Sequence, residues 1–208
     1  MGADEQRAAG RKPRGPYAAG QARRQAIVDE ALSVFSRTGF RGGSLREIAK
    51  RVGVTPAGLL HHFADKEELF AEVLQQRDAK VRAAAGDPAE HALLEQATRV
   101  VAYNRTSRGL TSLYVIVSAE ATDPEHPSHD DFAARYRDRA AEAEAILRLG
   151  QAAGEVRPEI DPAHAARLIS AVMDGIQLQW LLDDTVDMVA LFEEFVARYL
   201  LPMPGTGG

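Results

Sequence analysis

The amino-acid sequence contains no cysteine. That absence excludes a disulfide framework, a thiolate zinc site and a cysteine nucleophile. No apolar run approaches the roughly 18 residues that a membrane-spanning helix requires, and the N-terminus lacks the hydrophobic segment of a secretory signal peptide. We therefore expect a cytoplasmic protein with no membrane partner. The remaining composition, 45% hydrophobic and 26% charged residues in a chain of 208, is typical of a soluble globular protein of one or two domains.

The charge is divided unevenly along the chain. Residues 1–62 contain eleven Lys and Arg against five Asp and Glu, whereas residues 63–208 contain fourteen against twenty-five. A basic first part on an acidic body indicates a polyanionic partner at one end only, because phosphate contacts supply most of the non-specific affinity for DNA. A solvated basic tail is the alternative for residues 1–20. A protein that organises DNA without sequence preference should be basic overall, and this chain is acidic, with a net charge of −5.

Residues 44–63, SLREIAKRVGVTPAGLLHHF, have the pattern of two short helices joined by a tight turn. Ser44 and Glu47 are spaced as a capping box, so they predict a helix start at Ser44. Gly53 predicts the helix end, because glycine adopts the positive φ that helix ends often need. Thr55 as N-cap and Pro56 as first helical residue predict a second helix over residues 56–63. The first helix carries one apolar stripe, formed by Leu45, Ile48, Ala49 and Val52.

Two helices joined by a short glycine-containing turn form the motif that carries a recognition helix into the major groove of DNA. Around it, the chain matches a longer pattern in register, at Ile27, Ala31, Phe35, Gly39, Phe40, Ser44, Glu47, Ile48, Ala49, Gly53, Val54, Thr55, Leu59, His62, Phe63, Lys66 and Leu69. On these residues, the stretch 24–74 resembles the DNA-binding domain of the tetracycline-repressor (TetR) family of bacterial regulators. Gly43 and Gly58 depart from that pattern, which usually has threonine at both positions.

Several residues of this stretch are predicted to contact DNA. Arg41 and Arg46 lie near the start of the helix at Ser44, whose free amides can also receive a phosphate; either arginine could equally be a solvated surface residue. None of the residues at the front of the second helix can make a bidentate base contact, so specificity should lean on Arg46, water and DNA shape. These front residues, small enough to approach base edges closely, are Thr55, Pro56, Ala57 and Gly58.

The resemblance implies further contacts at the end of the recognition helix. Lys66 matches the family lysine that meets a phosphate, and one of His61 and His62 is expected to face the phosphate backbone. The alternative for a histidine is packing beside Phe63. Leu60 stands where the family commonly has a tyrosine whose hydroxyl touches a phosphate, so we do not expect that hydroxyl contact here. The predicted fold does not depend on it.

The rest of the chain predicts helices and no strands, so we expect an all-α fold of about nine helices. We divide it into a flexible basic arm (residues 1–20), a three-helix DNA-binding domain with the helix-turn-helix (21–66), and a larger ligand-binding and dimerisation domain (67–202). Beyond the motif, the apolar periodicity and the breaks at glycine and proline predict helices over residues 21–38, 66–85, 87–107, 110–121, 127–152, 162–182 and 187–201. The helix over 110–121 is apolar nearly all round, which favours a central position.

The last two predicted helices, 162–182 and 187–201, are apolar on more than one face. One face can pack on its own core, whereas the other needs a partner, so we expect a four-helix homodimer interface. Residues 173–180 also resemble, more loosely, the C-terminal domain of many TetR-type regulators. A dimer suits DNA reading as well, because two helix-turn-helix units read a palindromic operator with half-sites about one helical turn apart.

Small-molecule sites combine polar groups with apolar walls, and the predicted C-terminal domain offers such side chains. Each could instead be a core residue, and the expectation of an effector pocket comes mainly from the family. The candidates are Tyr103, Asn104, Tyr114, Val117, Ser118, Gln177 and Trp180. One cluster resembles metal ligands, but it lies where a loop and helix start favour the same residue types, so we expect no metal site and no cofactor. That cluster is His126, His129, Asp130 and Asp131.

The sequence therefore favours a dimeric, sequence-specific transcriptional regulator. We interpret it as a repressor that a small-molecule effector releases from a palindromic operator of double-stranded DNA. A transcriptional activator or a ligand-independent regulator of the same fold is the alternative. An all-helical enzyme would need a convergent acid, base or metal constellation, and the sequence shows no such catalytic set.

Overall fold

The computed structural model of the chain describes residues 16–86 and 93–202. These ranges hold α-helices and no strands, which confirms the predicted all-α fold with an N-terminal helix-turn-helix. The elements are α1 (Pro16–Gly42), α2 (Leu45–Val52), α3 (Pro56–Leu60), α4 (Lys66–Ala85), α5 (Leu93–Thr106), α6 (Arg108–Glu120), α7 (His129–Ala153), α8 (Pro162–Leu182) and α9 (Met188–Phe195), followed by a π-helical turn at Val196–Leu200. Among the helices of these two ranges, none is long and apolar enough to cross a membrane.

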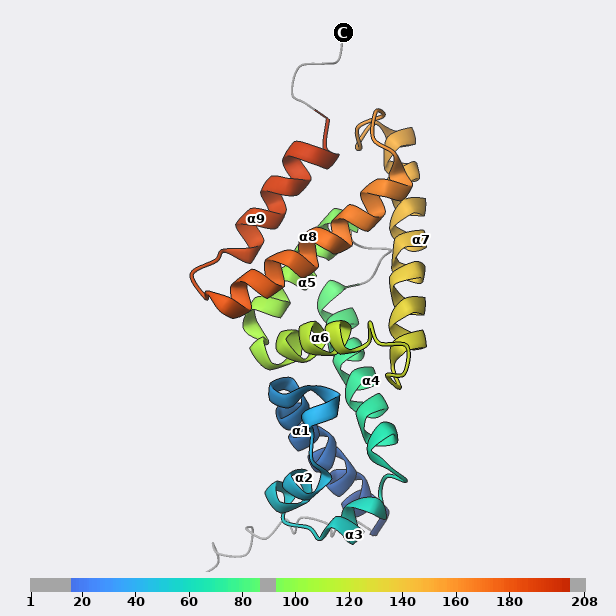
Figure 1. Ribbon diagram of the computed structural model, residues 1–208. Coiled ribbons are helices and arrows are strands. Elements are labelled where there is room, and N and C mark those ends of the chain that lie inside the picture. The colour runs from blue at the N-terminus through green and yellow to red at the C-terminus, as the bar shows by residue number, and fades with distance from the viewer. Residues whose placement is uncertain (1–15, 87–92, 203–208) are drawn as a thin grey trace, which may run out of the picture.

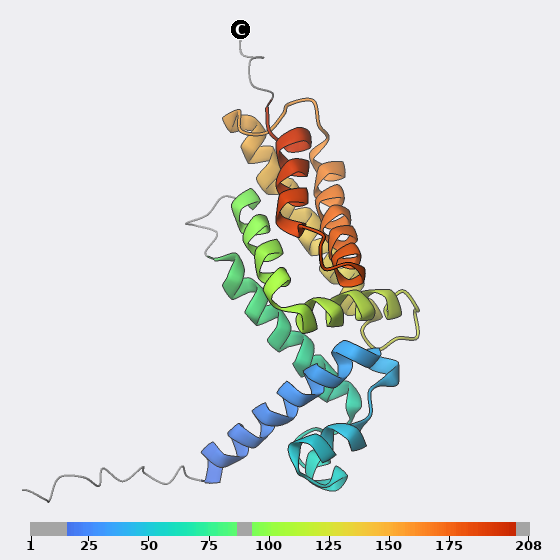
Figure 2. The same cartoon turned by 90° about the vertical axis from the view of Figure 1, so that its left-hand side faces the viewer.

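The helices form two groups joined by α4. Helices α1, α2 and α3 gather at one end, whereas α5, α7, α8 and α9 form a bundle at the other (Figure 1). Helix α4 runs from the first group into the second, and α6 lies across the boundary between them (Figure 2). Because α4 spans about 30 Å at 1.5 Å per residue, any tilt of this helix moves the small group relative to the bundle.

Each of the two groups of helices has its own hydrophobic core. The first contains the buried faces of α1 to α4 and also Leu113, Tyr114 and Val117 of α6. The second is built from α5, α7, α8 and α9 around Trp180 and Phe192. The predicted helix at 110–121 is therefore central, as its composition indicated, but it belongs to the core of the DNA-binding group. This sharing makes α6 the structural base on which α1 rests.

Helix α1 differs in length from the prediction. It begins at Pro16, five residues before the predicted start, so residues 16–20 are helical and do not belong to a flexible arm. Residues 1–15 of that predicted arm lie outside the described residues. The predicted break at Gly39 is present as a non-helical backbone with φ +66°, after which one more turn reaches Gly42. Buried Phe35 packs edge-on against Phe70 of α4, with ring centroids 5.0 Å apart.

The caps of α2 and α3 follow the sequence with two corrections. Ser44 accepts a hydrogen bond from the Glu47 amide at 3.4 Å, but the Glu47 carboxylate lies 2.7 Å from Arg51 instead of returning to the Ser44 amide, so the capping box is half formed. Gly53 ends α2 with φ +75°. Helix α3 ends at Leu60, three residues before the predicted end, because the backbone turns at residues 61 and 62.

Helix α4 starts at the predicted cap. Asp65 accepts from the Glu68 amide at 2.7 Å, while the Glu68 carboxylate accepts from the amide of Ala64, one residue earlier than a standard capping box. Helix α5 is described from Leu93 onward, and its predicted start at residue 87 lies outside the described residues. Asp161 and Asp187 cap α8 and α9 through two backbone amides each.

Candidate nucleic-acid interface and effector pocket

The front of α3 forms an exposed edge of small side chains. Thr55, Pro56 and Ala57 are exposed, and Gly58 is half-buried behind them. The Thr55 hydroxyl oxygen accepts a hydrogen bond from the Gly58 amide at 3.0 Å, which leaves the hydroxyl proton and the methyl group of Thr55 free to meet DNA. A Cβ on Gly58 would lie 3.2 Å from that oxygen, so glycine permits this tight cap.

The end of α3 adds larger side chains to the same edge. Leu60 is 47% exposed and His61 is exposed, whereas His62 is half-buried. The centroids of the two imidazole rings lie 5.7 Å apart, and the ring planes are inclined at 71° to each other. Phe63 is buried. The predicted alternative is that one of the two histidines packs beside it. His61 is therefore the histidine that is better placed to face a phosphate.

Two cations on α2 have no ion-pair partner in the described part of the chain. Arg46 and Lys50 are exposed and four residues apart, which places both on one face of the helix. Ser44, the half-buried N-cap of this helix, presents the free amide end beside Arg46. Sequence reasoning named Arg46 and missed Lys50, although the i, i+4 spacing was a readable signal.

Other arginines of the DNA-binding group are held by carboxylates. Arg24 lies 2.7 Å from Glu72, and Arg51 lies 2.7 Å from Glu47. Arg37 approaches the same Glu47 at 3.5 Å. Within residues 16–62, ion pairs with carboxylates thus neutralise part of the positive charge, whereas Arg46 and Lys50 of α2 keep theirs unpaired.

Arg41 and Lys66 occupy the boundary between the two groups. Arg41 forms an ion pair with Asp123 in the loop after α6. The Lys66 ammonium lies 4.5 Å from the centroid of the Phe40 ring and 3.4 Å from the Arg41 carbonyl. Partial burial lowers the pKa of Lys66, and the charges of Glu67 and Glu120 oppose that shift. Contact of either cation with a phosphate stays a prediction.

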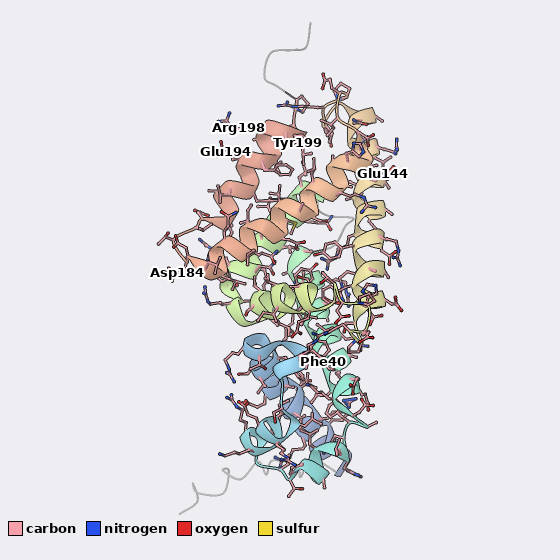
Figure 3. The ribbon with its side chains drawn as sticks, in the orientation of Figure 1. Phe40, Glu144, Asp184, Glu194, Arg198 and Tyr199 are labelled. Carbon is pink, nitrogen blue, oxygen red and sulfur yellow. The ribbon has the colours of Figure 1, made fainter. Side chains whose placement is uncertain are left out.

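A second contact at this boundary joins positions that are far apart in sequence. The Phe40 amide donates to the Glu120 carboxylate at 2.7 Å, and Figure 3 shows Phe40 where the lower helices meet α6. Gly39 is required here, since its φ is +66° and a Cβ would lie 2.4 Å from a Glu120 oxygen. Nearby, the Ser112 hydroxyl donates to the Ser36 carbonyl at 2.6 Å.

The two histidines of the cluster that resembles metal ligands make contacts within the protein. His126 is buried with its ring 5.2 Å from that of Phe40, and its Nδ1 accepts from the Ser128 amide at 3.1 Å. His129 Nδ1 lies 2.8 Å from the Ala121 carbonyl. Among the residues described, no group of three or more potential ligands could hold a metal ion.

A cavity of about 500 Å³ opens in the C-terminal bundle, between α4, α5, α7 and α8 with Tyr114 of α6 at one side. Three predicted effector residues, Asn104, Tyr114 and Gln177, line it. The structure places the other four outside the lining: Val117 lies in the first core, Trp180 in the second beneath Arg108, Ser118 donates to the Val115 carbonyl, and Tyr103 is half-buried on α5.

Charged residues that sequence reasoning missed surround this cavity. Arg77, only 3% exposed, holds its guanidinium 4.2 Å from the centroid of the Tyr114 ring. Asp78, behind the lining, lies 3.1 Å from Arg77 and 2.5 Å from Arg135. Burial raises the pKa of Asp78, but the hydrogen bond and charge of Arg135, with help from Arg77, outweigh burial and hold the pKa below its usual value. Asp78 is therefore ionised beside two cations.

The opposite side of the cavity carries a buried acid. The Tyr136 hydroxyl donates to the Asp174 carboxylate at 2.6 Å. Burial raises the pKa of Asp174, and the Tyr136 hydrogen bond with the charges of Arg139 and Arg77 only partly offsets this. The pKa of the Tyr136 hydroxyl is also raised, first by burial. The Tyr136 hydroxyl therefore stays protonated and donates its hydrogen bond to the Asp174 carboxyl group.

Comparisons with known proteins agree with this geometry. The family model described as bacterial regulatory proteins, tetR family, matches residues 27–73, and the one described as BetI-type transcriptional repressor, C-terminal, matches residues 91–201. The A-factor receptor protein of Streptomyces griseus is 32% identical over 74% of this chain, an alignment that spans 53% of that protein. The regulator UidR of Escherichia coli (strain K12) is 27% identical, with 75% and 80% of the two chains covered.

Solved structures show the same fold. A regulator from Saccharomonospora viridis in complex with choline superposes with a TM-score of 0.73 at 22% identity. The superposition covers 88% of this chain and 100% of that one. The ketosteroid regulator KstR2 of Mycobacterium tuberculosis gives a TM-score of 0.67 at 19% identity, covering 87% and 96%. The chain belongs to the tetR family of bacterial regulatory proteins, DNA-binding transcriptional repressors that act as homodimers on operators and typically respond to small-molecule effectors.

Proposed function

We propose that this chain is a homodimeric repressor that binds a palindromic operator through α2 and α3 and leaves it when a small molecule fills the bundle cavity. The observation that carries the proposal is the exposed edge of small residues on α3, together with the exposed and unpaired Arg46 and Lys50 on the preceding helix, α2. Small side chains permit close approach to base edges, and unpaired cations supply phosphate affinity. Operator DNA also implies a cytoplasmic site of action.

Each exposed group has a proposed role on DNA. The methyl groups of Thr55 and Ala57 meet base edges or thymine methyls, while Pro56 and Gly58 keep the front of α3 narrow. Arg46, Lys50 and the amide end of α2 at Ser44 contact phosphates, and His61 contacts the backbone at the other end of α3. Leu60 replaces a polar contact by an apolar one. Arg41 and Lys66 contact phosphate only if the boundary contacts rearrange.

A seam along α8 supports dimerisation through the last two helices. Its members are spaced alternately three and four residues apart, a repeat that suits helix packing against a partner. Leu178 is 48% and Leu182 81% exposed, and a Cβ on Gly175 would meet nothing within 4 Å. On α9, Leu191 is 43% exposed. The seam comprises Leu168, Ala171, Gly175, Leu178 and Leu182, and a second copy is its proposed cover.

Helix α4 is the proposed link between effector and operator. It contributes Arg77 and Val81 to the cavity wall and starts at Lys66, against Phe40. An effector that fits the cavity best when α4 is displaced favours a domain arrangement in which the two recognition helices no longer match the half-sites. The effector must bind that arrangement more tightly, since a ligand with equal affinity for both shifts nothing.

Sequence-related and structurally related proteins support the small-molecule part of the proposal. One relative is named as a receptor, and one similar structure contains choline. An activator or a ligand-independent regulator would use the same DNA surface and is the second candidate. An enzyme is disfavoured, because the polar groups that line the cavity, which include arginines, amides, Glu142, Ser170 and the Tyr136–Asp174 pair, show no serine hydrogen-bonded to a base.

The test is capture of fragmented genomic DNA from the encoding organism by the purified protein, followed by footprinting of the enriched fragments across salt concentrations. We expect a protected palindrome and a steep loss of affinity with salt. Arg46→Ala should weaken binding and reduce the slope of log affinity against log salt by about one. Arg137→Ala, an exposed arginine of α7, is the matched control and should change neither. Fragments enriched equally by wild type and Arg46→Ala would contradict the proposed interface.

A further inference from the structure

We propose that the effector is an uncharged, mostly apolar molecule whose buried end carries a hydrogen-bond donor and an acceptor side by side, as a carboxamide does. This inference rests on the proposed function, because it assumes that the cavity between α4, α5, α7 and α8 is the effector site. A cavity of about 500 Å³ suits a drug-sized organic molecule.

Two residues that line the cavity have buried polar atoms without hydrogen-bond partners. Asn104 is 1% exposed, and neither its side-chain nitrogen nor its oxygen makes a hydrogen bond. Gln177 is 3% exposed, and its side-chain oxygen is likewise unpaired. Buried polar groups are nearly always hydrogen-bonded in native proteins, since an unpaired one is costly. Two such amides, one on α5 and one on α8, both line one cavity, which indicates that a bound molecule completes their hydrogen bonds.

The polarity of these atoms defines the head group. Asn104 offers a donor group and an acceptor whichever way its amide is turned, and Gln177 adds an acceptor in the orientation of its amide in this structure. A carboxamide supplies a carbonyl for the Asn104 donor and N–H groups for the two acceptors. A carboxylate only accepts, so it would leave the oxygens of Asn104 and Gln177 unpaired and bring negative charge against them.

The charges of the cavity exclude a cationic head. A quaternary ammonium would need an aromatic face, but the Tyr114 ring already has the Arg77 guanidinium 4.2 Å from its centroid and that of Arg139 at 5.9 Å. Arg77 is paired with Asp78, and the other two arginines of the lining, Arg82 and Arg139, match its two acids, Glu142 and Asp174, so the lining offers a cation no excess of negative charge. This chain should therefore not share the choline recognition of its structural neighbour.

The walls suit the apolar remainder of the molecule. They come from α4, α5, α7 and α8. Burial of hydrocarbon against such walls supplies most of the affinity, while Asn104 and Gln177 select the head group. The apolar lining comes from Val81, Ala97, Val100, Ala143, Ile146, Ala166, Ile169 and Met173.

The test compares three probes with one alkyl chain: octanamide, octanoate and octyltrimethylammonium, each titrated calorimetrically into the full-length protein without DNA. We expect octanamide to bind about tenfold or more tighter than either charged probe, because one completed buried hydrogen bond corresponds to about that factor. Octanoate or octyltrimethylammonium binding as tightly as octanamide would overturn the inference, and so would undetectable binding of all three.

Leucine substitutions identify the atoms responsible. Asn104→Leu and Gln177→Leu remove unpaired groups, so each should keep or raise the thermal midpoint while reducing the preference for octanamide to less than about threefold. Gln151→Leu is the matched control: its amide donates to the Arg157 and Ile160 carbonyls, outside the cavity, so it should lower the midpoint and leave the preference unchanged. A preference that survives both cavity variants would overturn the assignment. Operator capture tests the proposed function separately.

Discussion

The Glu120 carboxylate accepts a hydrogen bond from the Phe40 amide at 2.7 Å, across the boundary between the DNA-binding helices and α6. These residues lie eighty positions apart, and the contact fixes the end of α1 to the helix that adjoins the bundle cavity through Tyr114. A fixed contact of this kind transmits a change in α6 to the helix-turn-helix only while it is intact.

Glu120→Ala should therefore weaken both the fold and the coupling. Losing the acceptor leaves the Phe40 amide unpaired, at a cost of about 1–3 kcal/mol in the free energy of unfolding. Urea denaturation measures that loss, and operator affinity with and without effector measures coupling. Glu120→Gln keeps a carbonyl oxygen for the amide and should restore most of both. Equal coupling in Glu120→Ala and wild type would show that the contact is not part of the transmission path.

Gly43→Ala should destabilise the DNA-binding group. A Cβ at Gly43 would lie 2.3 Å from a carbon of the buried Phe35 ring, so the ring or the backbone must shift, at a cost of about 1–3 kcal/mol. Gly20→Ala, in open space on α1, is the control and should be neutral or stabilise by up to about 1 kcal/mol. Thermal unfolding of the two variants compares them, and similar midpoints would contradict the predicted clash.

His126 should make the protein less stable in mild acid. Burial holds the pKa of His126 below its ordinary value, with Glu120 and Asp123 opposing and Arg41 assisting. The unfolded chain therefore takes up a proton near pH 6.5 that the folded protein resists, so the free energy of unfolding is largest above about pH 6.5 and falls as the pH decreases below it. His126→Gln should flatten this dependence between about pH 5 and 7. Parallel profiles for the two proteins would contradict the shift.

Leu178→Glu should separate the two copies without unfolding either. The residue is 48% exposed on the α8 seam, so the single chain tolerates a carboxylate there, whereas two copies would bury two like charges. Leu149→Glu on α7, where the leucine is 70% exposed, is the matched control. Sedimentation should show a monomer for Leu178→Glu and a dimer for Leu149→Glu. A dimer in both cases would place the interface elsewhere.

Local features of this fold were predictable from sequence. The caps at Ser44, Thr55 and Asp65 and the left-handed end at Gly53 depend on residues within four positions of each other, and all are present. The end of α3 at Leu60 was not, because the turn that follows it comes just before Phe63, which is buried in the first core, and a helical pattern does not show such a tertiary contact.

The cavity was only partly predictable because it is assembled from several helices. Asn104 and Gln177 were named for their polar ends, but Tyr103 lies one residue, and so about 100° around α5, from Asn104 and misses the lining. Arg77 was missed because a charged residue in a helix is usually at the surface. Its burial depends on Asp78 and on the Tyr114 ring, thirty-seven positions away.

Selection of bound sequences from a random pool of double-stranded DNA tests the central claim most directly, since it needs no knowledge of the regulated genes. Wild-type dimer should enrich a two-fold-symmetric sequence with half-sites about 10 base pairs apart, centre to centre. The pool selected by Arg46→Ala/Lys50→Ala should show weaker enrichment at equal protein and salt concentration. A pool with no enriched sequence, or an enriched one without symmetry, would contradict a dimeric operator-binding regulator.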